Sequence, residues 1–304
     1  MNTQIKRILL PIDLSETSLN ALNTAMRMAK RHNAQLHLLY TQDIMDYYPK
    51  MGRMAPLEPM LEEVLEKDKL LLEKIVQSIF YTHQINCFLH VEIGYRSTII
   101  TEKSKELDID VIVLGTAPDI ADQSYLNDSL AYKILQNTTS HVLTVPAGKE
   151  INNFKKIIFP VLIQENAITK LKMSRSLIEK NNATVSVVGI VKQQDLPLLS
   201  TVRDFSESIK RRAKTFSGSV TRKSVYSLNS SKDIMGISKN EKAQLIVVEG
   251  NTKRNFKEFF FGNFTQRMIR NAEFAVLFIK DIPLQKIVRV PLQMAYSTPS
   301  KLNL

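Results

Sequence analysis

The sequence is short of the residues and segments that mark several large classes of protein. With a single cysteine, Cys87, it forms no internal disulfide, which favours a reducing compartment. No apolar run approaches the roughly 18 residues of a membrane span, and the apolar residues near the start are interrupted by Pro11 and followed by Asp13, unlike a secretory signal. The histidines are scattered without metal-ligand spacing, and neither a Walker lysine nor a nucleophile elbow occurs. We therefore expect a cytoplasmic globular protein, without a membrane segment, that is not an enzyme.

The charge that is present is unevenly distributed. Residues 1–150 carry 15 Lys and Arg against 19 Asp and Glu, whereas residues 151–304 carry 26 against 11. The opposite charges could hold the two halves together within one chain, or the basic surplus of the second half could attract an anionic partner. The sequence does not distinguish these two alternatives. The basic run at 210–214 has few aromatic neighbours and belongs to no nucleic-acid motif, so nucleic acid is not expected as a partner.

An internal repeat accounts for the length of the chain. KRILLPID at 6–13 matches KKIIFPVL at 155–162, and NAQLHLLY at 33–40 matches NATVSVVG at 182–189, both at an offset of 149 residues. The offset falls to 135 for VIVLG at 111–115 against IVVEG at 246–250, and to 134 for SHVLTV at 140–145 against FAVLFI at 274–279. We predict two copies of one domain, residues 1–149 and 150–281, and a C-terminal tail, residues 282–304. The extra length of the first copy is predicted to lie in residues 42–60.

Within each copy, short apolar runs alternate with longer amphipathic ones. Such strands are typical of burial on both faces, and hence of a parallel sheet with helices on each side, so the predicted fold class is α/β. In the first copy the expected strands are 8–12, 36–40, 87–91, 111–115 and 142–145, and the expected helices are 16–31, 57–82, 97–107 and 129–137. In the second copy the expected strands are 156–162, 184–190, 219–228, 245–250 and 275–279.

The order of these segments resembles the universal stress protein domain. The residues that carry the resemblance are the strand ILLPID with Ser15 and a helix after it, then DIDVIVLG, a polar loop, a short helix and HVLTVP. The resemblance covers both copies and implies two tandem, open, five-stranded parallel sheets of Rossmann-like, adenine nucleotide alpha hydrolase-like fold, which form a pseudo-dimer in one chain. It also implies that HVLTV and AVLFI pair antiparallel across the junction, which would cover two exposed sheet edges.

The resemblance further implies a site for ATP or AMP, with magnesium, where the first and fourth strands of a copy meet. Doubly wound sheets bind ligands at the carboxyl ends of strands where the winding direction reverses. There Asp13 would accept hydrogen bonds from ribose hydroxyls, and glycines beginning with Gly115 would let backbone N–H groups approach phosphates. The alternative is that Asp13 is a cap or turn residue before the next helix, in competition with Ser15.

The loop after the fourth strand of the first copy departs from the family pattern G-x2-G-x9-G-[S/T]. Counted from Gly115, the second glycine falls on Pro118, the third on Asp128, and the Ser/Thr on Ser129. Pro118 removes a backbone donor, and Asp128 places a carboxylate where a phosphate would sit. Both changes oppose anion binding unless a divalent cation bridges the carboxylates and the phosphates. We predict that Asp128 caps the following helix in place of a phosphate.

The second copy departs in another way. Gly250 is kept, Lys253 takes the place of the second glycine, and Gly262 with Asn263 matches the third glycine and its polar partner if one loop residue is deleted. This basic loop would attract an anion, but Leu162 stands where the first copy has its aspartate, so the ribose contact is missing. The alternative for the lysine is a solvated loop residue.

Two functions from different classes follow. In one, the chain binds ATP or AMP through Asp13, Gly115 and Ser129, or through the basic loop of the second copy, and slow ATP hydrolysis stays open. In the other, nucleotide binding has been lost and the chain acts through a protein partner. We favour the second because both loops break the glycine rule for close approach of the backbone. Residues 42–60 are interpreted as part of a partner surface under the second hypothesis, and the alternatives for this segment are a lid over an adenine or a variable connection.

Overall fold

The computed structural model describes residues 4–43, 57–117, 129–162, 166–227, 229–250 and 261–280. The first half contains β1 (Arg7–Ile12), α1 (Glu16–His32), β2 (Gln35–Gln42), α2 (Leu57–His83), β3 (Cys87–Ile93), α3 (Arg96–Glu106), β4 (Val111–Thr116), α4 (Leu130–Asn137) and β5 (His141–Pro146). The second half contains β6 (Lys156–Val161), α5 (Ala167–Lys180), β7 (Thr184–Lys192), the 3-10 helix η4 (Gln193–Leu198), α6 (Leu199–Ala213), β8 (Ser219–Ser227), α7 (Ser230–Asn240), β9 (Leu245–Glu249), α8 (Phe261–Asn271) and β10 (Ala275–Ile279). The predicted α/β class is confirmed, and every predicted strand overlaps an observed one.

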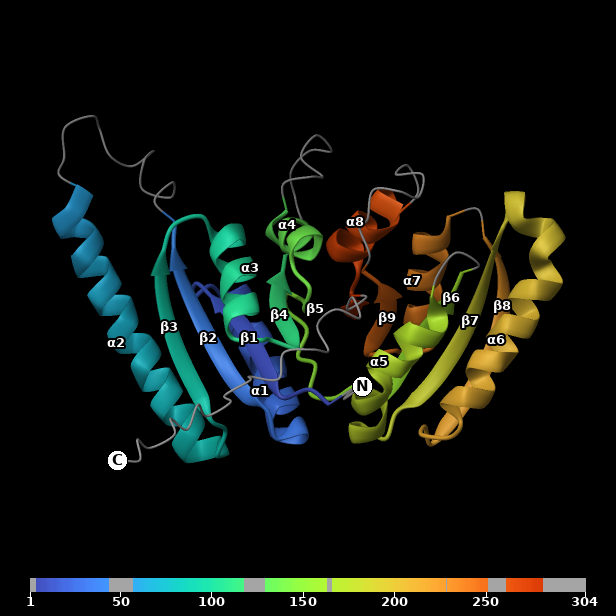
Figure 1. Ribbon diagram of the computed structural model, residues 1–304, viewed down its shortest axis with the longest axis horizontal. Helices are drawn as coiled ribbons and strands as arrows, with labels where there is room; N and C mark the ends of the chain where they lie inside the picture. Colours follow the sequence, from blue (N-terminus) through green and yellow to red (C-terminus); the bar gives the residue numbers. More distant parts are fainter. Residues whose placement is uncertain are drawn as a thin grey trace, which may run out of the picture.

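The strands form one sheet in the order β3-β2-β1-β4-β5-β10-β9-β6-β7-β8 (Figure 1). All neighbouring pairs are parallel except β5 and β10. Helices α1, α2, α5 and α6 supply the core on one face, and α3, α4, α7 and α8 supply it on the other. Each half is therefore an open five-stranded parallel sheet between two helical layers, as the resemblance implies.

The two halves join edge to edge. β5 pairs antiparallel with β10, with Val142 opposite Phe278 and Thr144 opposite Val276, which confirms the predicted pairing of HVLTV with AVLFI. The backbone N–H of Lys280 donates to His141 Nδ1 at 3.1 Å, and its Nζ donates to the carbonyl of Leu135 in α4 at 2.8 Å. These contacts satisfy polar groups that the junction buries.

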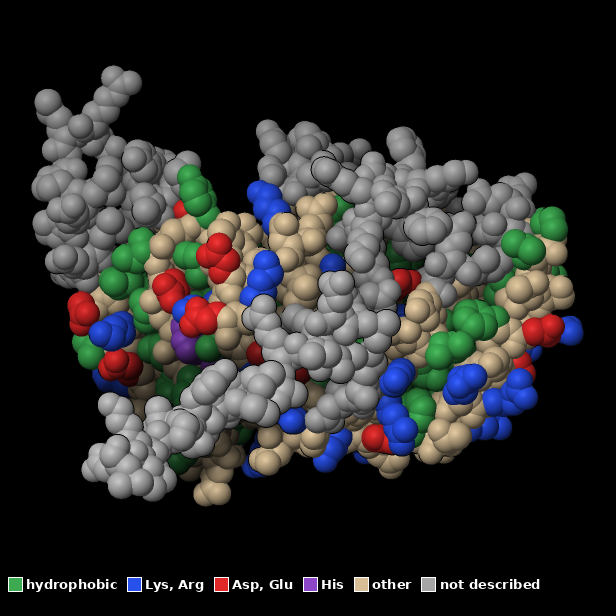
Figure 2. All heavy atoms as spheres, in the orientation of Figure 1, with side chains coloured by type: hydrophobic (Ala, Val, Ile, Leu, Met, Phe, Trp, Pro, Cys, Tyr) green, Lys and Arg blue, Asp and Glu red, His purple; other side chains and the backbone are tan. Residues whose placement is uncertain are grey.

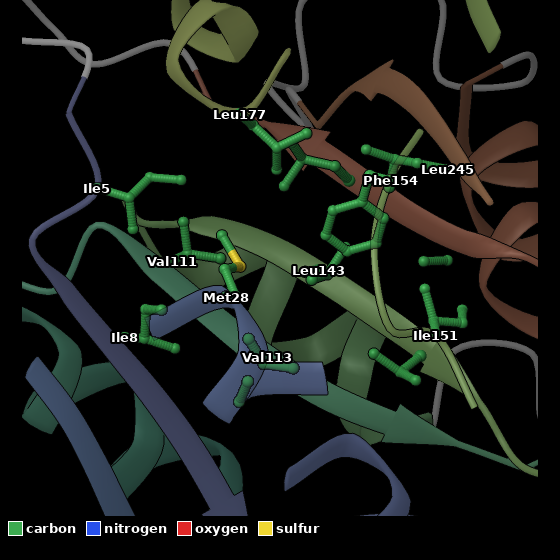
Figure 3. Packing of buried hydrophobic residues seen from close by; sticks show 14 of the residues in the cluster. Ile5, Ile8, Met28, Val111, Val113, Leu143, Ile151, Phe154, Leu177 and Leu245 are labelled. Carbon is green, nitrogen blue, oxygen red and sulfur yellow. The ribbon is translucent and has the colours of Figure 1, made fainter. Parts of the chain in front are cut away.

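The hydrophobic core continues through the junction. Figure 3 shows Leu143 of the first half near Phe154, Leu177 and Leu245 of the second, and all four side chains belong to one buried cluster. Burial of an apolar side chain contributes about 1.5–3 kcal/mol to folding. Because residues of both halves belong to this cluster, each half contributes to the stability of the other, and the two are not independent folding units.

The two halves differ most in the connection after their second strand. α2 is 27 residues long and α6 is 15, so part of the extra length of the first copy lies within the helix and not in residues 42–60 alone. Residues 44–56 lie outside the described part of the chain. Within the described residues, no helix combines the length and the apolar character needed to cross a membrane.

Candidate functional site

The sheet itself marks one place for a ligand in each half. β1 pairs with β2 along its whole length, from Arg7 to Ile12, but with β4 only through Ile8 and Leu9. β6 behaves in the same way, pairing with β9 only through Ile157 and Ile158. The strands therefore separate toward their carboxyl ends, where the winding reverses and where sheets of this kind bind ligands. We call the end of β1 and β4 the first switch point, and the end of β6 and β9 the second.

At the first switch point, Asp13 organises the turn that starts α1. Its Oδ1 accepts hydrogen bonds from the backbone N–H of Ser15 at 3.1 Å and from Ser15 Oγ at 2.5 Å. Ser15 is the N-cap of α1, since its Oγ accepts from the N–H of Ser18 at 3.2 Å. Of the two alternatives for capping, Ser15 therefore holds the cap, and Asp13 fixes the position of the capping hydroxyl.

Arg96, the first residue of α3, brings a positive charge to Asp13 and was not identified from the sequence. Its Nη1 lies 3.9 Å from Asp13 Oδ2, and the two side chains are 32% and 43% exposed. Partial burial by itself raises the pKa of Asp13, but the hydrogen bonds from Ser15 and Ser18, together with the charge of Arg96, outweigh it and hold that pKa below its ordinary value. Asp13 is thus an ionised carboxylate at neutral pH.

The turn before α3 explains how Arg96 reaches across β2. Gly94 has a φ of 141°, in the region that favours glycine, and its N–H donates to the carbonyl of Gln42 at the end of β2 at 3.0 Å. This bond holds the start of α3 above β2, beside β1. The signal in the sequence was a glycine two residues before a cation, shortly after the strand predicted at 87–91.

Gly115 has a packing reason that is independent of any ligand. A Cβ at this position would lie 2.8 Å from both the carbonyl carbon and Cγ2 of Thr17, and still closer to its carbonyl oxygen. Only glycine lets the first turn of α1 approach β4 so closely. The presence of Gly115 therefore does not by itself indicate a phosphate site.

Ser129 also has a structural role. It is the N-cap of α4, where its Oγ accepts from the N–H of Tyr132 at 3.2 Å. The prediction that Asp128 caps this helix is wrong, because the N-cap is the serine one residue later, whose hydroxyl accepts from an N–H of the first turn. Pro118 and Asp128 lie outside the described residues.

At the second switch point the polar groups are different. Leu162, in the place of Asp13, is 7% exposed and belongs to the core. Asn166 caps α5 by accepting from the N–H of Thr169 at 3.2 Å, and its own N–H donates to Glu249 Oε2 at 3.3 Å. The apolar side chain of Leu162 cannot accept a hydrogen bond from a ribose hydroxyl.

A buried lysine stands beside this second switch point. Lys170 is 1% exposed, although it takes the place of Ala21 in the repeat. Its Nζ donates to the carbonyl of Pro160 in β6 at 2.6 Å and lies 4.6 Å from the centre of the Phe159 ring. The ammonium is thus held by groups of the protein itself, which offsets part of the cost of burying it.

The remaining predicted residues of the second copy are only partly described. Gly250 follows β9, and its N–H donates to the carbonyl of Ile279 at 2.8 Å. A Cβ on it would lie 3.0 Å from Phe278 Cβ and 3.2 Å from Leu135 Cδ1, so this glycine serves the domain junction. Gly262 and Asn263 lie in the first turn of α8, and Lys253 lies outside the described residues.

We next consider which described residues near these groups could support catalysis. Among the described residues, no three His, Cys, Asp or Glu side chains lie together as a metal site. Burial raises the pKa of the Cys87 thiol to about 12, so it stays protonated and is a poor nucleophile.

Comparison with known proteins shows which family the two copies of the repeat match. The model of the universal stress protein family matches residues 4–146 and 153–280. A universal stress protein of Methanocaldococcus jannaschii is 25% identical over 149 residues, which are 48% of this chain and 84% of that protein. A crystal structure of a universal stress protein from Archaeoglobus fulgidus superposes with a TM-score of 0.71 at 18% identity, covering 92% of this chain and 98% of the other. A putative universal stress protein from Pseudomonas aeruginosa superposes with a TM-score of 0.62 at 16% identity, covering 91% and 94%. At these identities the two structures support the fold alone.

Proposed function

Because this chain belongs to the universal stress protein family, we propose that it acts by binding and not by catalysis, through a protein partner, with both of its nucleotide sites degenerate. The observation that carries the proposal is the engagement of Asp13 by Ser15. A carboxylate that already accepts two hydrogen bonds from its own turn has less capacity to accept from a ribose diol.

The second switch point supports the same proposal by a different route. An apolar residue, Leu162, takes the place of the ribose acceptor, and the ammonium of Lys170 is bonded to Pro160 in the adjoining strand. Among the described residues of this switch point, the position of the ribose acceptor is therefore apolar, and the ammonium of Lys170 is engaged by the adjoining strand. We therefore assign this half a scaffolding role within the pseudo-dimer.

A second candidate function is binding of ATP or AMP, with magnesium, at the first switch point. The observation in its favour is the position of Arg96, whose guanidinium lies 3.9 Å from Asp13 Oδ2 and offsets the negative charge that a phosphate would otherwise meet. In this arrangement Asp13 Oδ2 remains available to a hydroxyl group, because Ser15 bonds to Oδ1.

Calorimetric titration of the full-length protein with ATP, with and without magnesium, separates the two functions. Degenerate sites predict no micromolar binding in either condition. Micromolar binding that is abolished by Asp13→Ala, and retained by Asp108→Ala, would contradict the proposal. Asp108 is a suitable control because its side chain is 77% exposed and pairs with Arg7 near the opposite end of β1. Thermal unfolding of both variants controls for loss of the α1 cap.

A further inference from the structure

The two outer strands of the sheet, β3 and β8, have no strand on their other side within the described chain (Figure 1). The repeat makes them equivalent, because Leu39 of β2 and Val188 of β7 stand at the offset of 149 residues. Their partners in the outer strands, His90 and Lys223, therefore occupy the same position. An edge strand presents unpaired backbone N–H and C=O groups that another strand can bind. The two edges can thus be compared residue by residue.

The second of these strands, β8, carries charges of the kind that protect a free edge. Arg222 pairs with Glu207 of α6 at 3.1 Å. Lys223, whose side chain is 52% exposed, pairs with Glu241 at the carboxyl end of α7. A strand that docked here would remove these charged groups from water, which costs free energy. β8 is therefore a protected edge.

The first strand, β3, lacks this protection. Leu89 and His90 take the places of the two cations of β8, and the strand Cys87–Ile93 contains neither lysine nor arginine. Its one carboxylate, Glu92, is held by Lys103 of α3 at 2.7 Å. Nothing in the sequence of β3 therefore opposes the approach of another strand in the way that the two cations of β8 do.

The backbone of β3 offers a regular set of groups on its outer side. The N–H of Leu36 donates to the carbonyl of Asn86, and the N–H of Gly94 donates to the carbonyl of Gln42. Because hydrogen-bonding directions alternate along a strand, the even-numbered residues of β3 face β2. The outward N–H and C=O groups then belong to the odd-numbered residues, Cys87, Leu89, Val91 and Ile93.

Exposed hydrophobic side chains accompany this edge. Phe80 and Tyr81 lie near the end of α2, and their rings contact edge to face. Phe88 and Ile93 of β3 are exposed as well, and so is Tyr95 in the turn that follows. Figure 2 shows hydrophobic side chains at the surface over α2 and β3. Exposed hydrophobic residues that are clustered, and not scattered singly, mark an interaction surface.

A second copy of this chain fits the edge. Two β3 strands related by a two-fold axis perpendicular to the sheet are antiparallel, and each face of one sheet continues the same face of the other. The chain already makes a junction of this kind once, between β5 and β10, which are equivalent in the repeat and pair antiparallel. A two-fold pair of β3 strands leaves neither of them as an edge, so the assembly closes as a dimer.

We propose that the chain forms a homodimer through β3, with the β3 strands of the two copies antiparallel, so that the two ten-stranded sheets become continuous. The ladder between the copies satisfies the outward backbone groups of β3, and the contact covers the exposed side chains of Phe88 and Ile93. The protected strand β8 stays at the two ends of the combined sheet.

Analytical ultracentrifugation of the full-length protein over a series of concentrations tests the proposal. We expect a dimer in the wild type, and a dissociation constant at least about tenfold higher in Ile93→Lys, which places a lysine on the pairing edge. The matched control is Tyr226→Lys. Tyr226 holds the equivalent position on β8 and is 50% exposed, against 55% for Ile93, and its replacement should leave the dissociation constant unchanged.

A second pair of variants tests the backbone ladder without adding charge. The N–H of Val91 points away from β2, so Val91→Pro removes an outward donor and leaves the pairing of β2 with β3 in place. Ser224→Pro makes the same change at the equivalent position of β8. We expect weakened dimerisation in Val91→Pro alone. Thermal unfolding of each variant distinguishes loss of the dimer from loss of the fold.

A wild type that is monomeric at every concentration would overturn the proposal, as would equal dissociation constants in the wild type and Ile93→Lys. Dissociation caused by Tyr226→Lys and not by Ile93→Lys would place the interface on β8 and would overturn it as well. None of these measurements involves ATP or another protein, so the homodimer and the proposed function succeed or fail separately.

Discussion

Leu143 of β5 pairs directly with Leu277 of β10, and these two leucines occupy the same position of the internal repeat, at an offset of 134 residues. A pseudo-two-fold axis therefore passes between them, as it would pass between identical residues at the interface of a symmetric homodimer. The junction consists of two paired edge strands and a shared hydrophobic core. It therefore resembles the interior of one domain more than a transient contact between two domains.

This arrangement predicts that the joint is essential to the stability of both halves. Leu143 and Leu277 are 0% and 2% exposed, so Leu143→Ala and Leu277→Ala should each lower the free energy of unfolding by about 2–5 kcal/mol. Urea unfolding followed by circular dichroism measures this, and we expect one cooperative transition in each variant. Leu70→Ala, at a side chain that is 55% exposed, is the control and should have little effect. Two separate transitions in the wild type would show that the halves unfold independently.

The close approach of α1 to β4 makes Gly115 sensitive to the smallest substitution. Gly115→Ala places a methyl group against the backbone of Thr17, and we expect it to destabilise the protein by about 1–3 kcal/mol. Gly236→Ala is a matched control within a helix, where a Cβ would meet nothing within 4 Å, and it should stabilise by up to about 1 kcal/mol. Thermal unfolding of the two variants gives the comparison. Equal effects would show that Gly115 is not needed for packing.

The cap of α4 gives a test of which residue begins that helix. Ser129→Ala should cost about 1 kcal/mol, because it removes the acceptor for the N–H of Tyr132. Asp128→Ala should cost much less, and chemical denaturation of both variants measures the difference. A larger loss from Asp128→Ala would restore the aspartate as the cap.

Acid should destabilise the protein through its buried histidines. Burial, aided by Lys280, lowers the pKa of His141 from 6.5 to about 4, and burial with neighbouring cations lowers that of His32 to about 4 as well. A lowered histidine pKa means that the unfolded chain takes up a proton that the folded chain refuses. The stabilisation is therefore complete above about pH 6.5 and decreases as the pH falls toward 4.

For a fully buried histidine, such a shift corresponds to a contribution on the order of 3 kcal/mol. Denaturant unfolding at a series of pH values gives the slope, and His141→Asn, which keeps an acceptor for the N–H of Lys280, should reduce it. A slope that is the same in the variant and the wild type would exclude His141 as a contributor.

The elements of the fold could be read from the sequence because they depend on local patterns. The strand at 111–115 and the helix at 16–31 follow from apolar periodicity and capping residues, and the structure places them at Val111–Thr116 and Glu16–His32. The antiparallel junction was also predicted, but through resemblance to a family and not from periodicity. The domain boundary at residues 149 and 150 stays a prediction, because the core is continuous across it.

The site was predicted less completely than the fold. Asp13 and Ser129 lie at turns around the first switch point and Gly115 lies near the end of β4, but the sequence did not show that each has a structural partner: Ser15, the N–H of Tyr132 and Thr17, respectively. The assignment of the α4 cap was wrong by one residue because a serine and an aspartate in sequence are equally good caps. Only the path of the backbone decides between them.

The sequence by itself determined where the chain forms strands and helices, that it does so twice, and which residues stand at the turns between them. Tertiary structure alone decided which charged and polar groups come into contact. Arg96 approaches Asp13 across the end of β2, and Lys170 finds its acceptor in Pro160. The physical reason is that hydrophobic periodicity fixes the face of each element, whereas contacts between side chains depend on how far neighbouring strands separate and how each helix crosses them.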